Sequence, residues 1–228
     1  MKNKIIIILL ILLILFISFL LVLKYFKEKP IKDLMQKQAL KNAPQKTGEE
    51  KKAAIIIAFR NFRDEEYFQT AEVLAKGEIE LTIVSDQKGI AVGTDGGQVH
   101  VDLTLEDLLV EEFDAILFIG GPGAKAAFDN ESAYNIAQEA VKKDKTLAAI
   151  CIAPTILAKS GALEGKRATV WASSEDKSSI KILEENGALF VDEKVVQDGN
   201  IITGNGKEAS EEFGQRVLEN IIDIKKNR

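Results

Sequence analysis

The only cysteine of the chain, Cys151, stands where an apolar run turns into a helical pattern. Residues 147–150 read as a buried strand, and the helical pattern begins at Pro154. Such a sharp turn exposes its side chain, and the N-terminus of the following helix favours negative charge there. Because the thiolate is the nucleophilic form of cysteine, this position predicts a reactive thiol with a lowered pKa. A lone cysteine in an apolar stretch is also often an inert core residue, so both interpretations stay open at this point.

A second candidate feature is the glycine-rich loop at 120–123, which follows an apolar run over 114–119. Backbone N–H groups in such a loop are little screened by side chains and are suited to binding an oxyanion. In open α/β sheets the chemistry lies at the carboxyl ends of the strands. We therefore expect this loop, the turn at Cys151 and the loop after Phe59 to meet in one crevice. An ordinary tight turn would explain the glycines alone, but their combination with Cys151 favours a site.

The elements that would position these residues alternate between strands and helices. Apolar runs typical of strands buried on both faces lie at 53–59, 79–84, 114–119 and 147–151, and helical spacing appears at 64–76, 132–143 and 154–159. This order predicts an α/β fold with a parallel sheet covered by helices on both faces. The predicted domain spans residues 52–223, an ordinary length for a single domain.

The remaining elements of this domain are less regular. Further strands are expected at 99–101, 168–171 and 201–203, further helices at 177–185 and 208–222, a glycine-rich loop at 89–97 and a small hairpin at 189–196. We find no internal repeat.

The first residues of the chain carry a different signal. Residues 5–23 are apolar apart from Ser18, and a helix of about 19 residues would span about 28 Å, enough to cross a bilayer core. No small-residue cleavage site follows, so a retained single-pass transmembrane helix over 1–23 is favoured over a cleaved signal peptide. We interpret 24–51 as a lysine-rich juxtamembrane linker and 224–228 as a basic tail.

Membrane localisation is thus expected, but the side that the domain faces is left open. Lysines flank both ends of the apolar run, with more of them after it. The positive-inside rule would then keep the domain in the cytoplasm, whereas a large C-terminal domain can be exported despite a modest charge bias. The 35 acidic and 30 basic residues give a net charge of −5 with no nucleic-acid motif, which excludes nucleic acid as a partner.

The residues around both candidate features resemble the DJ/PfpI superfamily. The matching segments are Phe-Ile-Gly-Gly-Pro-Gly at 118–123 and Ala-Ile-Cys-Ile-Ala-Pro at 149–154, supported by landmarks at 113–115, 163–169 and 196–203. The resemblance covers the whole predicted domain. It implies a flavodoxin-like three-layer sandwich of the glutamine-amidotransferase type, a nucleophile elbow at Cys151 and a homodimer.

The resemblance also implies a functional carboxyl beside the cysteine, at the start of the first helix. The alignment puts Glu66 there, with Glu65 as the alternative if the register differs by one residue. A protonated carboxyl can donate a hydrogen bond to a thiolate and so stabilise it. The backbone N–H groups of Gly121 and Ile152 would then act as oxyanion donors.

Three departures from the family pattern bear on the activity. Protease-like members have histidine directly after the cysteine and a glutamate after the Gly-Gly turn, where this chain has Ile152 and Lys125. The position of a deglycase-branch histidine is taken by Trp171, which would form an apolar pocket wall or belong to the core. His100, the only histidine, lies upstream on another strand and is expected at the periphery.

Two function classes remain. The first is a cysteine-dependent enzyme of glyoxalase or deglycase type that acts on small reactive carbonyls, with Cys151 as nucleophile, Glu66 as proton shuttle and no metal or cofactor. The second is a non-hydrolytic redox-sensing or chaperone-like module whose Cys151 is oxidised. A cysteine peptidase is a distant third, because the base and its orienting partner are both missing.

Overall fold

The computed structural model of the chain describes residues 50–226, and residues from Glu50 onward form one compact unit. The transmembrane helix predicted over 1–23 and nearly all of the linker predicted over 24–51 lie outside the described residues, as does the end of the predicted basic tail. Within the described range, no helix is long and apolar enough to cross a membrane.

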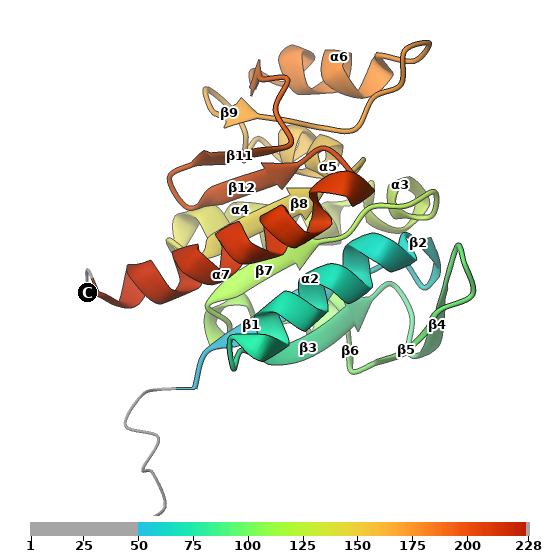
Figure 1. The fold of residues 1–228 in the computed structure, drawn as a ribbon, viewed down its shortest axis with the longest axis vertical. Helices are drawn as coiled ribbons and strands as arrows, with labels where there is room; N and C mark the ends of the chain where they lie inside the picture. Colours follow the sequence, from blue (N-terminus) through green and yellow to red (C-terminus); the bar gives the residue numbers. More distant parts are fainter. Residues whose placement is uncertain (1–49, 227–228) are drawn as a thin grey trace, which may run out of the picture. The chain divides into compact units, whose positions relative to one another are not determined.

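A seven-stranded sheet forms the middle layer (Figure 1), and its order is β11-β12-β8-β7-β1-β3-β6. Its strands are β1 (Lys52–Ile56), β3 (Glu80–Ser85), β6 (Leu103–Thr104), β7 (Ala115–Phe118), β8 (Thr146–Ile150), β11 (Val195–Asp198) and β12 (Ile201–Gly204). All neighbours pair in parallel except β11 and β12, which are antiparallel. The predicted mostly parallel sheet is confirmed.

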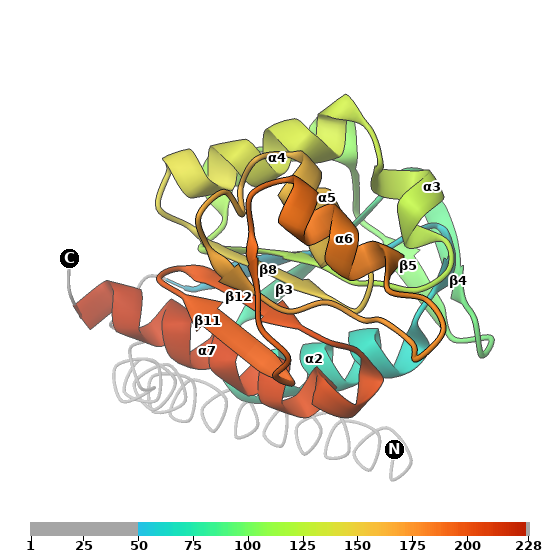
Figure 2. The same ribbon diagram turned by 90° about the horizontal axis from the view of Figure 1, so that it is seen from above.

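Helices cover both faces of this sheet, as Figure 2 shows: α2 and α7 lie on one side, and α4 and α5 on the other. The helices are α2 (Asp64–Lys76), α3 (Ala124–Phe128), α4 (Glu131–Lys142), α5 (Pro154–Lys159), α6 (Ser178–Glu185) and α7 (Ser210–Lys226), with short 3-10 turns η1 (Leu105–Asp107), η2 (Val110–Glu112) and η3 (Lys207–Ala209). The three-layer α/β architecture predicted from the sequence is therefore present.

Two hydrophobic cores, one on each side of the sheet, hold the layers together. Along β1, Ala54 and Ile56 belong to one core, while Ala53 and Ile55 belong to the other. Successive side chains of a strand point to opposite faces, and all four are fully buried. This explains why the strand is a continuous apolar run instead of an alternating one.

Two expectations for the peripheral segments are wrong. The expected loop at 89–97 contains strand β4 (Gly89–Gly93), which joins β2 (Arg60–Phe62) and β5 (Gln98–Val101) in a small sheet. The glycines of this segment favour a loop in the sequence pattern, whereas Ala91 between them is buried and paired in the sheet.

The expected hairpin at 189–196 is also absent. Its first part, β10 (Leu189–Phe190), pairs in parallel with β9 (Arg167–Ala168), which covers only the start of the strand expected at 168–171. Its last part belongs to β11, whose hairpin partner is β12. In both cases the structure is determined by pairing between segments that are distant in the sequence. The local residue pattern does not show such pairing.

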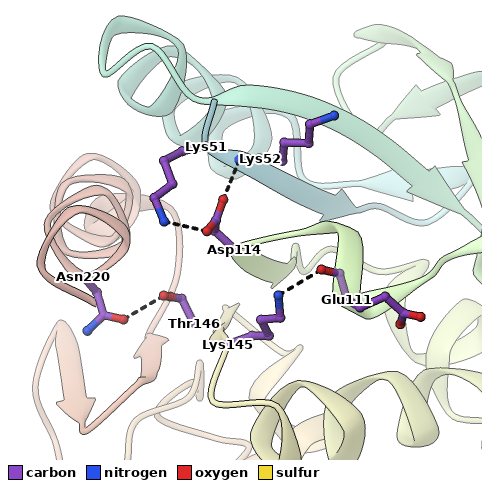
Figure 3. Close-up of polar contacts among 7 residues, drawn as sticks. All are labelled: Lys51, Lys52, Glu111, Asp114, Lys145, Thr146 and Asn220. Atoms are coloured by element: carbon purple, nitrogen blue, oxygen red, sulfur yellow. Dashed lines mark hydrogen bonds and ion pairs between the residues drawn. The ribbon is translucent and has the colours of Figure 1, made fainter. Parts of the chain in front are cut away.

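Polar contacts fix the amino ends of the central strands (Figure 3). The Asp114 carboxylate accepts hydrogen bonds from Lys51 Nζ at 2.6 Å and from the Lys52 backbone N–H at 2.9 Å. Beside it, Thr146 at the start of β8 donates to the side chain of Asn220 on α7 at 2.7 Å. The end of the sheet opposite the loops that follow β7 and β8 is thus tied together around the first described residues.

Candidate active site

Cys151 follows β8 in a left-handed backbone conformation, with φ of 63°. This conformation is unfavourable for residues other than glycine and persists only where the surroundings enforce it. Here the Cys151 N–H donates to the Gly204 carbonyl at 2.9 Å, and its own carbonyl accepts from the Trp171 N–H at 2.8 Å. The strand-to-turn geometry expected of an elbow cysteine is therefore present and held from both sides.

Glu66, in the first turn of α2, is the carboxyl beside this cysteine. The residue is 1% exposed, its carboxyl interacts with the Cys151 thiol and the Gly120 N–H, and its Oε2 has no hydrogen-bond partner among the described residues. Its neighbour Glu65 faces solvent and pairs with Lys207 at 3.6 Å. Of the two candidates considered from the sequence, the structure brings Glu66 to the thiol.

The loop after β7 approaches the same thiol with its backbone. The backbone N–H groups of Gly121 and Ile152 lower the pKa of the Cys151 thiol, which places both expected oxyanion donors near the sulfur. A Cβ on Gly120 would lie 2.6 Å from the Cys151 Cβ and 3.0 Å from Glu66 Oε2. Only glycine therefore permits the approach of this loop to both side chains.

Burial dominates the acid–base behaviour of this pair. It raises the pKa of Glu66 to about 7, although the interaction with Cys151 and the charge of Arg63 oppose the shift. Burial also raises the pKa of the Cys151 thiol, and the charge of Glu66 raises it further, while the N–H groups of Gly121 and Ile152 act in the opposite direction. The lowered thiol pKa expected from the sequence is wrong. The helix α5 is only six residues long, and burial beside a carboxylate outweighs the effect of its N-terminus on the thiol pKa.

A cavity of about 580 Å³ opens above the pair. It is lined by Arg63, Glu66, Gly121, Pro122, Lys125, Cys151, Ile152, Trp171, Lys207 and Glu208. Trp171 is 44% exposed, so it is a wall of the cavity and not part of the core. The loop after β1, the glycine loop and the cysteine turn meet here as expected from the strand order.

Asp64 fixes the turn of α2 that carries Glu66. Its carboxylate accepts hydrogen bonds from the N–H groups of Asp95 at 2.8 Å and Gly97 at 2.7 Å, and from the Thr94 hydroxyl at 3.1 Å. Burial alone would raise the pKa of Asp64, but these donors hold it below its usual value. The hairpin of β4 and β5 thereby clamps the start of the helix two residues before Glu66.

The departures from a protease-like site are also visible in the structure. Lys125 lines the cavity from α3, and Ile152 follows the cysteine. The side chain of His100 on β5 is 73% exposed and pairs with Asp102, and it does not line this cavity. Among the lining residues there is thus no imidazole to act as a base.

Sequence reasoning did not single out Arg63, Pro122, Lys207 and Glu208. Lys207 and Glu208 follow β12, so the rule that sites lie at the carboxyl ends of parallel strands would have found them. Arg63 directly precedes α2 and carried no signal apart from its proximity to Glu66 in the sequence.

With this geometry established, comparisons with known proteins identify the family. The model of the DJ-1/PfpI family matches residues 51–220. The chain belongs to the DJ-1/PfpI family. Its curated relatives include an uncharacterized protein of Methanocaldococcus jannaschii, 36% identical over 171 residues, 75% of this chain and 82% of the relative. Deglycase PfpI of Pyrococcus furiosus is 31% identical over 149 residues, 65% of this chain and 87% of the relative.

Solved structures of the family agree with this fold. A ThiJ/PfpI domain protein from Brachyspira murdochii aligns with a TM-score of 0.72 and 26% identity, covering 77% of this chain and 99% of that one. DJ-1beta of Drosophila melanogaster aligns with a TM-score of 0.65 and 26% identity, covering 78% and 97%.

Proposed function

We propose that this chain is a cysteine-dependent enzyme of deglycase or glyoxalase type that acts on small reactive carbonyls. The observation that carries the proposal is the buried pair of Cys151 and Glu66 at the base of an open cavity. The Deglycase PfpI relative supports the same class. A peptidase is disfavoured, because no histidine lines the cavity to serve as the base of a triad.

The proposed chemistry uses Glu66 to move one proton. With a pKa of about 7, the carboxylate accepts the thiol proton as the sulfur adds to the aldehyde carbon of the substrate, and then returns it to the carbonyl oxygen. This step forms one S–C bond and converts the C=O group to a hemithioacetal. The N–H groups of Gly121 and Ile152, which lower the pKa of the thiol, would stabilise the developing oxyanion.

With a 2-oxoaldehyde the hemithioacetal can rearrange. Glu66 would take the proton from the former aldehyde carbon, and the neighbouring carbonyl carbon would receive a proton in its place. The resulting thioester is hydrolysed by one water, which frees the thiol and yields a 2-hydroxy acid. Oxidation and reduction occur within the substrate, so no external oxidant or cofactor enters.

The test is conversion of methylglyoxal to lactate by the purified chain. We expect turnover that is abolished in Cys151→Ser and strongly reduced in Glu66→Gln, since a positioned general base contributes about 10²–10⁴-fold. The control is Glu65→Gln, which removes an adjacent but exposed carboxylate and should keep the rate. Absence of lactate from the folded wild-type chain would reject the enzyme proposal.

A second candidate, a redox-sensing or chaperone-like module, is favoured by one observation. Two backbone N–H groups, those of Gly121 and Ile152, lower the pKa of the Cys151 thiol, and the same donors would hold the oxygens of a sulfinate. Mass spectrometry after peroxide treatment would then show a stable gain of two oxygens on Cys151 in a chain without turnover.

We further propose that the chain is held at a membrane by residues 5–23 and that it acts as a homodimer. The apolar length of that segment supports the first proposal, and family membership supports the second. Extraction of the chain from cell membranes by carbonate instead of detergent would reject the anchor. Protease protection in intact cells would report which side the domain faces.

A further inference from the structure

The cavity above Cys151 has more positive groups than the chemistry proposed for it requires. Arg63, Lys125 and Lys207 line it from three separate places, before α2, in α3 and in η3. The proton transfer uses only Glu66 and backbone donors. A function for these cations must therefore lie in what the cavity binds.

Their charges are unequally compensated. Lys207 pairs with Glu65 at 3.6 Å, and the charge of Arg63 acts on Glu66. Within the described residues Lys125 forms no ion pair within 4.0 Å. Its charge contributes to the lowered pKa of Asp129. Two carboxyl groups belong to the lining. Glu66 lies beside the thiol and has a pKa of about 7, so Glu208 is the one carboxylate in the outer part of the lining.

The size of the cavity also bears on what it binds. Its volume of about 580 Å³ lies within the range of about 300–1,000 Å³ found for pockets that hold drug-sized ligands. A three-carbon dicarbonyl would leave most of it empty. Trp171 supplies one apolar wall, so a longer substrate can lie against the indole while its reactive end meets the thiol.

We propose that the preferred substrate is an aldehyde or 2-oxo compound that carries a carboxylate or a phosphate, and that Lys125 is its main selecting residue. This inference rests on the proposed function and names its substrate class. The carbonyl carbon lies at the Cys151 sulfur, and the anionic group lies toward Lys125 and Arg63. Lys125 thus replaces the orienting glutamate of protease-like members with a cation that binds substrate.

The experiment compares two alkylating reagents of nearly equal shape, iodoacetate and iodoacetamide, which differ in charge. Cys151 is the only cysteine of the chain, so alkylation of the full-length protein reports this cavity alone. We expect the ratio of the iodoacetate rate to the iodoacetamide rate to exceed that of N-acetylcysteine amide, an uncharged free thiol. Lys125→Gln should reduce the ratio by about 3-fold to 10-fold, the effect of one charge at close range in a partly solvated site.

Two further variants make the result specific. Lys125→Arg keeps the charge and should keep the ratio. Lys181→Gln removes an exposed lysine of α6 that is outside the cavity and should also keep it. A wild-type ratio no greater than that of N-acetylcysteine amide, or a ratio unchanged in Lys125→Gln, would overturn the proposal.

Carbonyl compounds then distinguish the two anions. Glyoxylate should protect Cys151 from iodoacetamide at lower concentration than glyoxal if carboxylate is bound, and glyceraldehyde 3-phosphate at lower concentration than glyceraldehyde if phosphate is bound. Equal protection within both pairs would contradict the proposal. Because alkylation needs no turnover, anion selectivity without lactate formation would reject the enzyme proposal alone, and turnover without selectivity would reject this inference alone.

Discussion

Replacement of Glu66 by glutamine should change how the stability of the protein depends on pH. The raised pKa of Glu66 means that the folded state holds its proton more tightly than the unfolded chain. The stability from this group is fully present below the unfolded pKa of 4.5 and is lost as the pH rises through about 7. At about 1.36 kcal/mol per pKa unit, the shift corresponds to about 3 kcal/mol.

Glutamine does not titrate, so Glu66→Gln should remove this pH dependence. Between about pH 5 and pH 8, the wild-type chain should lose about 2.5 kcal/mol more stability than the variant, because part of the unfolded carboxyl is already ionised at pH 5. For a domain of this size that corresponds to about 5–10 °C in the midpoint of thermal unfolding. Melting curves recorded by circular dichroism in this pH range would measure it.

The comparison between pH values cancels any fixed cost of the substitution, such as an unpaired amide N–H. Glu65→Gln is the matched control, since this exposed residue is adjacent in the same helical turn. It should follow the wild-type pH dependence. The same dependence in Glu66→Gln as in the wild type would refute the assignment of a buried, half-protonated carboxyl.

Other substitutions test the supports of the site. Gly120→Ala should destabilise the fold by about 1–3 kcal/mol in urea unfolding, because its Cβ would meet the Cys151 Cβ at 2.6 Å. Gly199→Ala is the control, since this glycine has open space around it but a φ of 63°, and it should cost only about 1 kcal/mol. An equal cost at both glycines would contradict the steric argument. Asp64→Ala should cost about 2–4 kcal/mol of folding stability through lost charge-assisted hydrogen bonds. This cost should shrink as the pH falls below the ordinary carboxyl pKa, because the donors that lower the pKa of Asp64 stabilise only its ionised form. A cost independent of pH would show that the clamp is not ionic. His100→Ala should leave both the methylglyoxal rate and a negligible peptidase rate unchanged, and a loss of either would show that β5 reaches the thiol.

The sequence was sufficient for the elements with strong local patterns. The run before Cys151 is apolar because β8 is buried on both faces, and the helix predicted over 64–76 has those bounds in the structure. The meeting of Glu66, Gly121 and Cys151 followed from the family resemblance and from strand order, because parallel strands bring their carboxyl ends to one edge.

What could not be predicted depends on contacts between distant segments. The strand at Gly89–Gly93 is concealed by its glycines, whose lack of a Cβ admits the Asp64 carboxylate at Gly93. The thiol pKa was mispredicted because local position reports the turn but not the depth of burial or the charge of Glu66. Lys207 was missed because the loop after β12 was not counted among the loops of the crevice, and Arg63 because its residue type carried no signal of its own.

The contacts of Asp114 with Lys51 and Lys52 also determine how the domain would bear a mechanical load. The first described residues lead directly into β1, which lies between β3 and β7 with parallel hydrogen bonds on both sides. A pull on the chain at Glu50 along this strand would load both rows of bonds in shear, together with the ion pair of Lys51 at 2.6 Å. Many bonds would then have to break together instead of one after another. The chain thus enters the domain through an interior strand of the sheet, which cannot be peeled from an edge.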